Sequence, residues 1–305
     1  MSVLVLENVV KLFGKFTAVD KISFEVEPGT IFGILGPNGA GKTTTIRMIT
    51  NILMPDEGKI LLFDEPVNPV HQNRIGYLPE ERGLYKKIKV IEQLIYFAQL
   101  KGMTRSASHK AANQWLRDLD AKDWGNKKIQ ELSKGMQQKV QFISTILHSP
   151  DLLVLDEPFS GFDPINVETL KKIISDQKEA GKTILLSTHV MEQVEQLCDN
   201  IILINKGTII LQGNVQKIKR NFGKDYVLME FSGPDDFVND LQNIKFINRT
   251  KNRVEFRLNK TNYTANQILQ SAIDKGAEVI RFELVEPSLN EIFIDVVQKT
   301  GVENV

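Results

Sequence analysis

A glycine-rich loop that ends in a lysine and two threonines is the strongest chemical signal in the chain. It follows the apolar stretch 30–35, precedes a helical pattern over 44–53, and consists of Gly36, Pro37, Asn38, Gly39, Ala40, Gly41, Lys42, Thr43 and Thr44. Glycines allow successive backbone N–H groups to converge on phosphate oxygens, and the following helix directs its positive end to the same place. Lys42 is expected to bridge the β- and γ-phosphates, and the Thr43 hydroxyl to ligate Mg²⁺. The loop therefore predicts binding of a nucleotide together with Mg²⁺.

A pair of carboxylates, Asp156 and Glu157, follows the apolar stretch 152–155. Neighbouring side chains of a strand point in different directions, so the two acids can take different roles. Asp156 is expected to hold Mg²⁺ through its water shell, and Glu157 to polarise the attacking water as a general base. Acidic pairs after apolar strands are also common as solvated loop starts. The phosphate-type loop upstream is what favours the catalytic interpretation.

The overall composition excludes several classes of protein. Lys+Arg and Asp+Glu both number 38 in 305 residues, so the formal net charge is zero and no nucleic-acid partner is expected. Cys198 is the one cysteine, which excludes an internal disulfide framework and is expected to be a buried, unreactive residue. The first residues lack a signal-peptide pattern, and no apolar run approaches the roughly 20 residues of a membrane-spanning helix. The chain is expected not to cross a membrane by itself.

Hydrophobic patterns divide the chain into two parts with a boundary near Gly213. Strands alternate with helices over 1–215, which predicts an α/β domain with a mainly parallel sheet. A helical insertion over about 85–130 interrupts that domain, with a polar break over 101–108 between two helices. The region 222–302 shows the order strand–helix–strand–strand–helix–strand, with a last helix opening at Ser288. That order predicts a small α+β, ferredoxin-like accessory domain.

A short motif between the loop and the acidic pair carries a family resemblance. The run Leu132-Ser133-Lys134-Gly135-Met136 resembles the signature motif of the ATP-binding cassette (ABC) family and precedes the acidic strand as it does there. With the phosphate loop, the acidic pair and His189, the resemblance covers roughly residues 3–215. It implies a P-loop ABC nucleotide-binding domain with a mixed sheet core, an antiparallel β subdomain and a helical insertion.

The resemblance also implies a head-to-tail dimer that holds two ATP molecules at its interface. Ser133 and the Gly135 N–H, at a helix N-terminus, would then meet the γ-phosphate bound to the opposite subunit. The alternative for Ser133 is the ordinary role of an N-cap. Asp163, in a segment similar to the family's D-loop, would cross the dimer interface. His189 ends a predicted strand where the family places a switch histidine, and would contact the γ-phosphate and orient Glu157.

The adenine contact is less sharply defined by the sequence. Phe13 stands where an aromatic residue of the family usually stacks on adenine. The alternatives are that Phe13 is a core aromatic residue beside Leu12 and Phe16, or that Phe16 is the stacking ring.

Three residues depart from the family pattern and narrow the resemblance. Glu80 replaces the glutamine that approaches Mg²⁺ and the attacking water, and Lys134 and Met136 replace a glycine and a glutamine of the signature. A carboxylate at position 80 is expected to serve as a metal ligand but adds negative charge beside the phosphates. These departures, with the segment 77–85 and the tail 286–293, are similar to the type-2 exporter group, which includes ATPases of sodium- and drug-extrusion systems.

The resemblance implies an ATP-hydrolysing subunit that powers export through a separate integral-membrane permease. It would act as a homodimer or with a paired ATPase subunit, peripherally at the cytoplasmic face of the cell membrane. A non-transport ABC ATPase is disfavoured because the chain has one cassette and no room for a long coiled coil between Thr43 and Ser133. A small GTPase is disfavoured because the run Asn205-Lys206-Gly207-Thr208 lacks the acidic residue for guanine. Intact Lys42 and Glu157 argue against a degenerate regulator.

Overall fold

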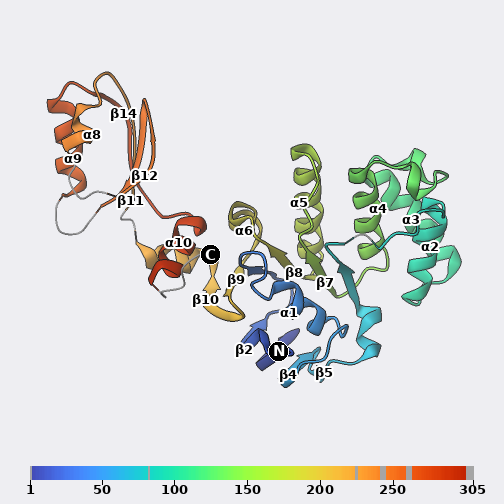
Figure 1. The fold of residues 1–305 in the computed structure, drawn as a ribbon. Helices are drawn as coiled ribbons and strands as arrows, with labels where there is room; N and C mark the ends of the chain where they lie inside the picture. Colours follow the sequence, from blue (N-terminus) through green and yellow to red (C-terminus); the bar gives the residue numbers. More distant parts are fainter. Residues whose placement is uncertain (1, 82, 224–225, 241–244, 259–262, 300–305) are drawn as a thin grey trace. The chain divides into compact units, whose positions relative to one another are not determined.

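The computed structural model describes residues 2–81, 83–223, 226–240, 245–258 and 263–299. The chain divides into two compact units, Met1–Gly213 and Asn214–Val305 (Figure 1). Each unit has its own sheets and its own hydrophobic core, and each is described separately below. No helix in these described ranges is long and apolar enough to span a bilayer.

An antiparallel sheet forms one layer of the first unit. Its strand order is β2-β1-β4-β5, with bounds β1 Leu4–Phe13, β2 Phe16–Val26, β4 Glu57–Leu62 and β5 Glu65–Pro66. Strands β1 and β2 form a hairpin in which Phe13 pairs with Phe16 at the turn.

A second sheet of six strands forms the centre of the first unit. Its order is β10-β9-β3-β8-β7-β6, with bounds β3 Ile31–Leu35, β6 Ile75–Leu78, β7 Leu152–Asp156, β8 Thr183–Thr188, β9 Asn200–Asn205 and β10 Thr208–Asn214. Strand β3 pairs in parallel with β8 and β9, and β7 pairs in parallel with β6 and β8. Strands β3, β7 and β8 are buried along their whole length, as expected for a sheet covered on both faces. The carboxyl ends of β3, β7 and β8 therefore lie together at one edge.

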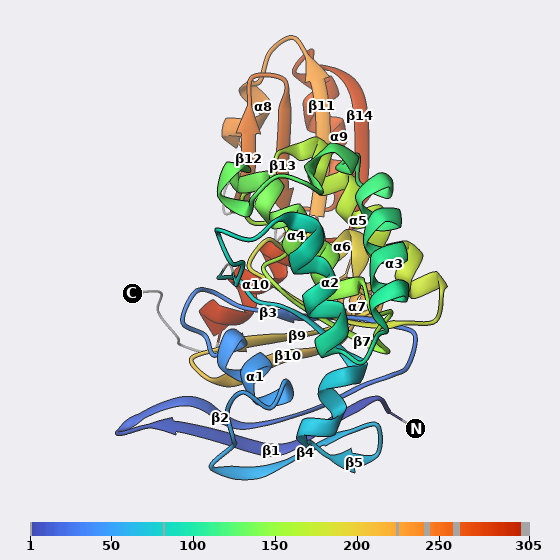
Figure 2. The same cartoon turned by 90° about the vertical axis from the view of Figure 1, so that its right-hand side faces the viewer.

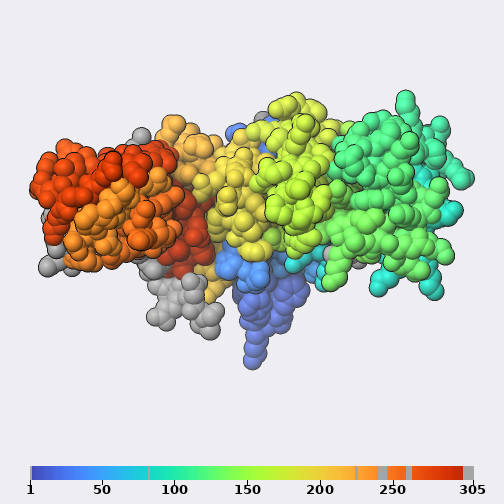
Figure 3. Space-filling view, turned by 90° about the horizontal axis from the view of Figure 1, so that it is seen from above, coloured from blue at the N-terminus to red at the C-terminus, as the bar shows by residue number. Residues whose placement is uncertain are grey.

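Helices surround this sheet and form the predicted insertion. Near the sheet lie α1 Lys42–Ile49, α5 Pro164–Glu179 and α6 Met191–Leu197, with a short 3₁₀ helix η1 Pro69–Arg74. The insertion contains α2 Val90–Leu100 and α3 Arg105–Asp118, packs on α4 Lys134–Ile146, and includes the 3₁₀ turns η2 Lys122–Trp124 and η3 Ile129–Glu131. Figures 2 and 3 show α2, α3 and α4 gathered into one lobe, coloured teal to green.

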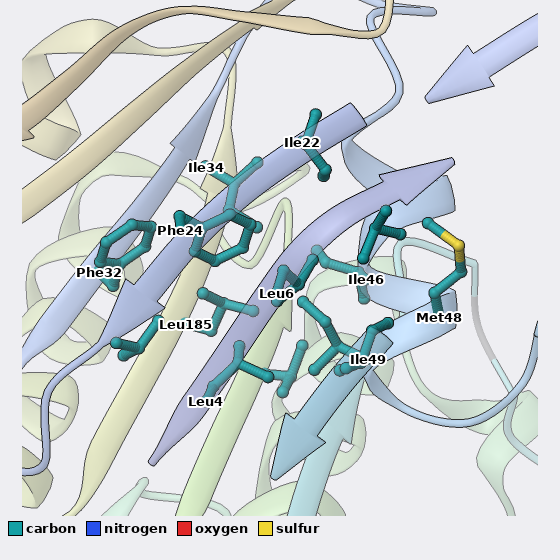
Figure 4. Close-up of a cluster of buried hydrophobic side chains, with 14 of the residues drawn as sticks. Leu4, Leu6, Ile22, Phe24, Phe32, Ile34, Ile46, Met48, Ile49 and Leu185 are labelled. Atoms are coloured by element: carbon teal, nitrogen blue, oxygen red, sulfur yellow. The ribbon is translucent and has the colours of Figure 1, made fainter. Parts of the chain in front are cut away.

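A continuous apolar core joins the two sheets to α1. Leu4 and Leu6 of β1 lie beside Ile46 and Ile49 of α1, and the stacked rings of Phe24 and Phe32 have centroids 5.2 Å apart (Figure 4). Burial of such side chains stabilises the fold by roughly 1.5–3 kcal/mol each. The packing fixes α1, whose N-terminus carries the lysine of the phosphate loop. Elsewhere in this unit Cys198 is buried, as predicted, and its burial raises the pKa of the thiol.

The second unit is an antiparallel sheet with helices. Its elements are α7 Val215–Phe222, β11 Tyr226–Ser232, α8 Asp236–Asp240, β12 Lys245–Thr250, β13 Arg253–Arg257, α9 Ala265–Asp274, β14 Glu278–Val285 and α10 Leu289–Lys299. The strand order is β12-β13-β11-β14, with antiparallel pairing throughout. Its own core includes Phe231, Phe237 and Phe256. The sequence did not predict β10 or α7, the two elements on either side of the boundary.

Candidate active site

The phosphate-type loop runs from the end of β3 to the start of α1, and close backbone contacts require its glycines. A Cβ atom on Gly36 would lie 2.2 Å from the carbonyl oxygen of Ile204, and one on Gly41 would lie 2.5 Å from that of Ala18. Gly41 is also the N-cap of α1, with φ 108°, and no side chain caps this helix. The backbone N–H groups at the start of α1 therefore remain available to an anion.

Lys42 is the first residue of α1 and is almost completely buried. Its Nζ donates hydrogen bonds to the carbonyl oxygens of Gly36 (2.7 Å) and Pro37 (3.2 Å), and it lies 3.9 Å from Glu157 Oε1. Burial lowers the pKa of Lys42, while the negative charges of Glu157, Asp156 and Glu80 oppose this effect. An incoming phosphate would supply the negative charge that a buried ammonium group lacks.

Asp156 ends β7 and offers one carboxylate oxygen for a ligand. Its side chain is 1% exposed, Oδ1 accepts a hydrogen bond from Ser187 Oγ, and Oδ2 has no hydrogen-bond partner among the described residues. Burial raises the pKa of Asp156, and the hydroxyls of Ser187 and Thr43 act in the opposite direction. Hard oxygen donors of this kind suit Mg²⁺, which binds proteins through one or two carboxylates and completes its shell with phosphate and water. Thr43 and Asp156 therefore fit the expected metal.

Glu157 stands one residue later and is held by contacts from the neighbouring strand. Its N–H donates to the carbonyl oxygen of Ser187 (3.0 Å), and its φ of 48° lies in the left-handed region. His189 Nδ1 lies 2.8 Å from Glu157 Oε1. Because a carboxylate only accepts hydrogen bonds, this contact places the imidazole proton on Nδ1. The same carboxylate oxygen, Oε1, thus contacts the histidine and lies near the Lys42 ammonium.

Lys42, Thr43 and Glu157 open onto a cleft of ≈ 360 Å³. Its lining comes from the phosphate-type loop, the β1–β2 hairpin and two glutamates. The lining residues are Phe13, Phe16, Ala18, Asn38, Gly39, Ala40, Gly41, Lys42, Thr43, Thr44, Glu80 and Glu157. Phe13 and Phe16 are 49% and 63% exposed, so neither is a core residue. The core-aromatic alternative for Phe13 is therefore wrong. Both rings line the cleft, and both are open to a planar ligand.

Seven of the expected site residues do not line this cleft. Gly36, Pro37, Asp156 and His189 adjoin or contact residues that do, whereas Ser133, Gly135 and Asp163 lie at the starts of other helices. Ser133 is the N-cap of α4, where its Oγ accepts a hydrogen bond from the Met136 N–H (3.3 Å). Asp163 is the N-cap of α5, and the hydrogen bonds that it accepts from Asn166 lower its pKa. Gly135 lies in the first turn of α4, where an added Cβ would have no neighbour within 4 Å. In one copy of the chain, the signature serine has the ordinary capping role that the sequence left open.

Two contributions to the site were not anticipated. Ser187 binds both acidic residues, through its side chain to Asp156 and through its carbonyl oxygen to Glu157. Gln141 Nε2 of α4 donates to the carbonyl oxygens of Pro79 and Glu81, on either side of Glu80. A polar residue within the otherwise apolar stretch 140–143 was the available signal for Gln141.

The fold and the cleft define the class of protein as a phosphate-loop nucleotide-binding protein. Comparison with known proteins gives the family. A family model described as "ABC transporter" matches residues 19–160, and a second, described as "ATP-binding protein DrrA1-3-like, C-terminal domain", matches residues 213–297.

Full-length relatives agree with these matches. The chain is 46% identical over 293 residues to an uncharacterized ABC transporter ATP-binding protein, YhaQ, of Bacillus subtilis, covering 96% of this chain and 97% of the relative. It is 36% identical over 224 residues to Nod factor export ATP-binding protein I of Cupriavidus metallidurans, covering 71% and 73%. A solved structure of an ATP-binding subunit of an ABC transporter superposes with a TM-score of 0.68 at 28% identity, covering 73% of this chain and 94% of that chain. The chain belongs to the ABC transporter family, as an ATP-binding ATPase subunit.

Proposed function

We propose that this ATPase subunit hydrolyses Mg-ATP to power export of a substrate through a separate membrane-spanning subunit. The observation that carries the proposal is the position of the Glu157 carboxylate at the cleft, 2.8 Å from His189 and 3.9 Å from Lys42. A carboxylate oriented in this way is suited to accept a proton from water, and the lysine beside it is suited to hold the phosphate under attack.

The steps of this mechanism are divided among residues in and beside the cleft. The loop N–H groups and Lys42 bind the β- and γ-phosphates, while Phe13 or Phe16 stacks on adenine. Thr43, Asp156 and Glu80 would hold Mg²⁺, which when bound neutralises phosphate charge. Glu157 accepts the proton of the attacking water. His189 keeps Glu157 oriented and contacts the γ-phosphate.

The residues at the starts of α4 and α5 complete the site of a second copy. Ser133 and Gly135 start α4 and are exposed or half-exposed, so a partner's γ-phosphate can reach them. Asp163 is exposed at the start of α5 and would cross the same interface. We infer a head-to-tail dimer, of two identical chains or of this chain with a paired ATPase, that closes on ATP and reopens after hydrolysis.

The transport role follows from the family and the organisation of the chain. Residues 1–215 form the ATPase domain, and its helical insertion over 85–130 transmits dimer closure to a permease at the cytoplasmic face of the membrane. Export is supported by the likeness to the Nod factor export protein. We assign 222–302 to an accessory domain of ferredoxin-like type, because the strand order β12-β13-β11-β14 is the one that a strand–helix–strand–strand–helix–strand chain of that type adopts.

Replacement of the proposed base tests the mechanism. Glu157→Gln retains the shape of the side chain but cannot accept the proton, so ATP hydrolysis is expected to fall by about 10²–10⁴-fold while ATP stays bound. Gel filtration with ATP should then show a dimer that the wild type does not accumulate. A Glu157→Gln protein that stays monomeric with ATP and Mg²⁺ would contradict the shared-site mechanism, and wild-type rates of phosphate release would contradict the assignment of the base.

A further inference from the structure

One face of α4 carries a row of polar side chains that bind the backbone of neighbouring segments. Gln137, Gln141 and Thr145 are spaced four residues apart and therefore lie on the same face of the helix. Each is tied to a different point along the chain. We refer to these three residues as the α4 ladder.

The first member of the ladder holds the segment that leads into the signature motif. Gln137 Nε2 donates to the carbonyl oxygens of Ile129 (3.2 Å) and Leu132 (3.0 Å). Leu132 directly precedes Ser133, the residue expected to meet the partner's nucleotide. The N-terminal end of α4 is therefore tied to the segment that leads into it.

The second and third members hold the segment that carries Glu80. Gln141 Nε2 donates to the carbonyl oxygens of Pro79 and Glu81, each at 3.2 Å. The single hydroxyl proton of Thr145 is shared between the carbonyl oxygen of Gln141 in the same helix (3.0 Å) and that of Tyr77 (3.4 Å). Gln141 is only 5% exposed, so water cannot easily replace these bonds. Glu80 itself is exposed and lines the nucleotide cleft. Its position is thus set from both sides by one amide group.

The backbones of β6 and α4 pack closely where the segment that carries Glu80 begins. A Cβ atom on Gly76 of β6 would lie 2.3 Å from the carbonyl oxygen of Thr145, so the backbones of β6 and α4 are in direct contact there. Tyr77, which follows Gly76, is buried enough that its pKa is raised to about 12. Beyond this contact, two hydrogen bonds from Gln141 connect α4 to the peptide groups on either side of Glu80.

We propose that Gln141 is a positioning residue, which holds the peptide groups on either side of Glu80 and so keeps the Glu80 carboxylate at the edge of the nucleotide cleft. Gln141 itself does not line that cleft. The inference rests on the proposed function, in which Glu80 is a ligand of Mg²⁺.

The test is steady-state ATP hydrolysis by the full-length chain as Mg²⁺ is varied. Gln141→Met retains an unbranched side chain of similar length without the donor, and Gln141→Glu replaces the donor with a carboxylate that would face the two carbonyl oxygens. Gln141→Met is expected to lower kcat about fivefold, an effect of about 1 kcal/mol, and Gln141→Glu to lower it further, with KM for ATP unchanged. The Mg²⁺ concentration at half-maximal rate should rise. Ser144→Ala is the matched control, because its hydroxyl bonds the Gln141 carbonyl within the same helix and not the Glu80 segment.

A double-mutant cycle separates positioning from a general effect on the fold. In a Glu80→Ala background, Gln141→Met should cause no further loss of kcat, because the side chain that it positions is gone. An equal loss in both backgrounds would overturn the inference, as would a wild-type kcat and Mg²⁺ requirement in both Gln141 variants. A wild-type chain with no ATPase activity would instead refute the proposed function.

Discussion

Two helix N-termini in the ATPase unit show opposite solutions to the same physical problem. The first N–H groups of any helix lack partners within the helix. At α1 no side chain caps them, and the glycine loop leaves them to a ligand beside a buried lysine. At α4 the cap is present within the chain, from Ser133.

The N-terminus of α1 is ready to bind an anion, whereas that of α4 must first lose its capping hydrogen bond. The end of α1 already gathers its charges, and it needs only the phosphates to satisfy its N–H groups. The end of α4 is satisfied in the isolated chain, so a second subunit's nucleotide must replace a capping bond, an exchange of about 1 kcal/mol. Binding of ATP by one chain and closure of two chains are therefore expected to be separable by mutation.

The largest effect is expected at the N-terminus of α1. Lys42→Ala removes the buried cation that faces the phosphates, and should lower ATP hydrolysis at least about 100-fold and weaken binding of a fluorescent ATP analogue. Lys172→Ala, at an exposed position of α5, is the control and should bind as the wild type does. Unchanged nucleotide binding by Lys42→Ala would mean that the comparison between the two ends is wrong.

A substitution at the N-terminus of α4 should impair closure of the dimer without affecting ATP binding. An aspartate fits at Gly135 in the single chain, because nothing lies within 4 Å of its Cβ position. Its charge would repel the partner's γ-phosphate, so Gly135→Asp should bind ATP normally yet lose turnover by about 100-fold and fail to dimerise in the Glu157→Gln background. Gly135→Ala is the uncharged comparison. Normal turnover of Gly135→Asp would remove this helix end from the shared site.

The smallest effect is expected at Glu80. Glu80→Gln restores the family's usual residue and keeps a polar group at the exposed edge of the cleft. A change within about fivefold in phosphate release is expected, since an exposed charge contributes on the order of 1 kcal/mol or less. Complete loss of activity would show that the carboxylate itself is essential.

Residues whose chemistry depends on local order could be identified from the sequence. The loop Gly36–Thr44 and the pair Asp156 and Glu157 were placed correctly at strand ends, because an apolar run followed by glycines or acids is a local pattern. The element order of the second unit was also visible. Strand β10 and helix α7 were missed because a short strand with a half-exposed pattern and an eight-residue helix give weak periodicity.

Contacts between distant segments could not be predicted in this way. Helix α1 ends at Ile49 rather than at residue 53, because Asn51 takes a left-handed conformation with φ 55°. The Gln141 bonds join residues about sixty positions apart, and Ser187 reaches Asp156 from the next strand of the sheet. Such pairings depend on how the sheet is assembled, which a single sequence does not encode in its spacing.

The left-handed backbone of Glu157 has a consequence for the stability of variants at this position. A non-glycine residue in this conformation costs the fold about 1–3 kcal/mol, and asparagine or glycine tolerates it better. The position that the chemistry needs most is therefore one where backbone conformation alone would favour another residue. Replacement by asparagine or glycine would relieve this strain but would also remove the carboxylate beside the buried Lys42 and beside His189, so the two effects on stability oppose each other.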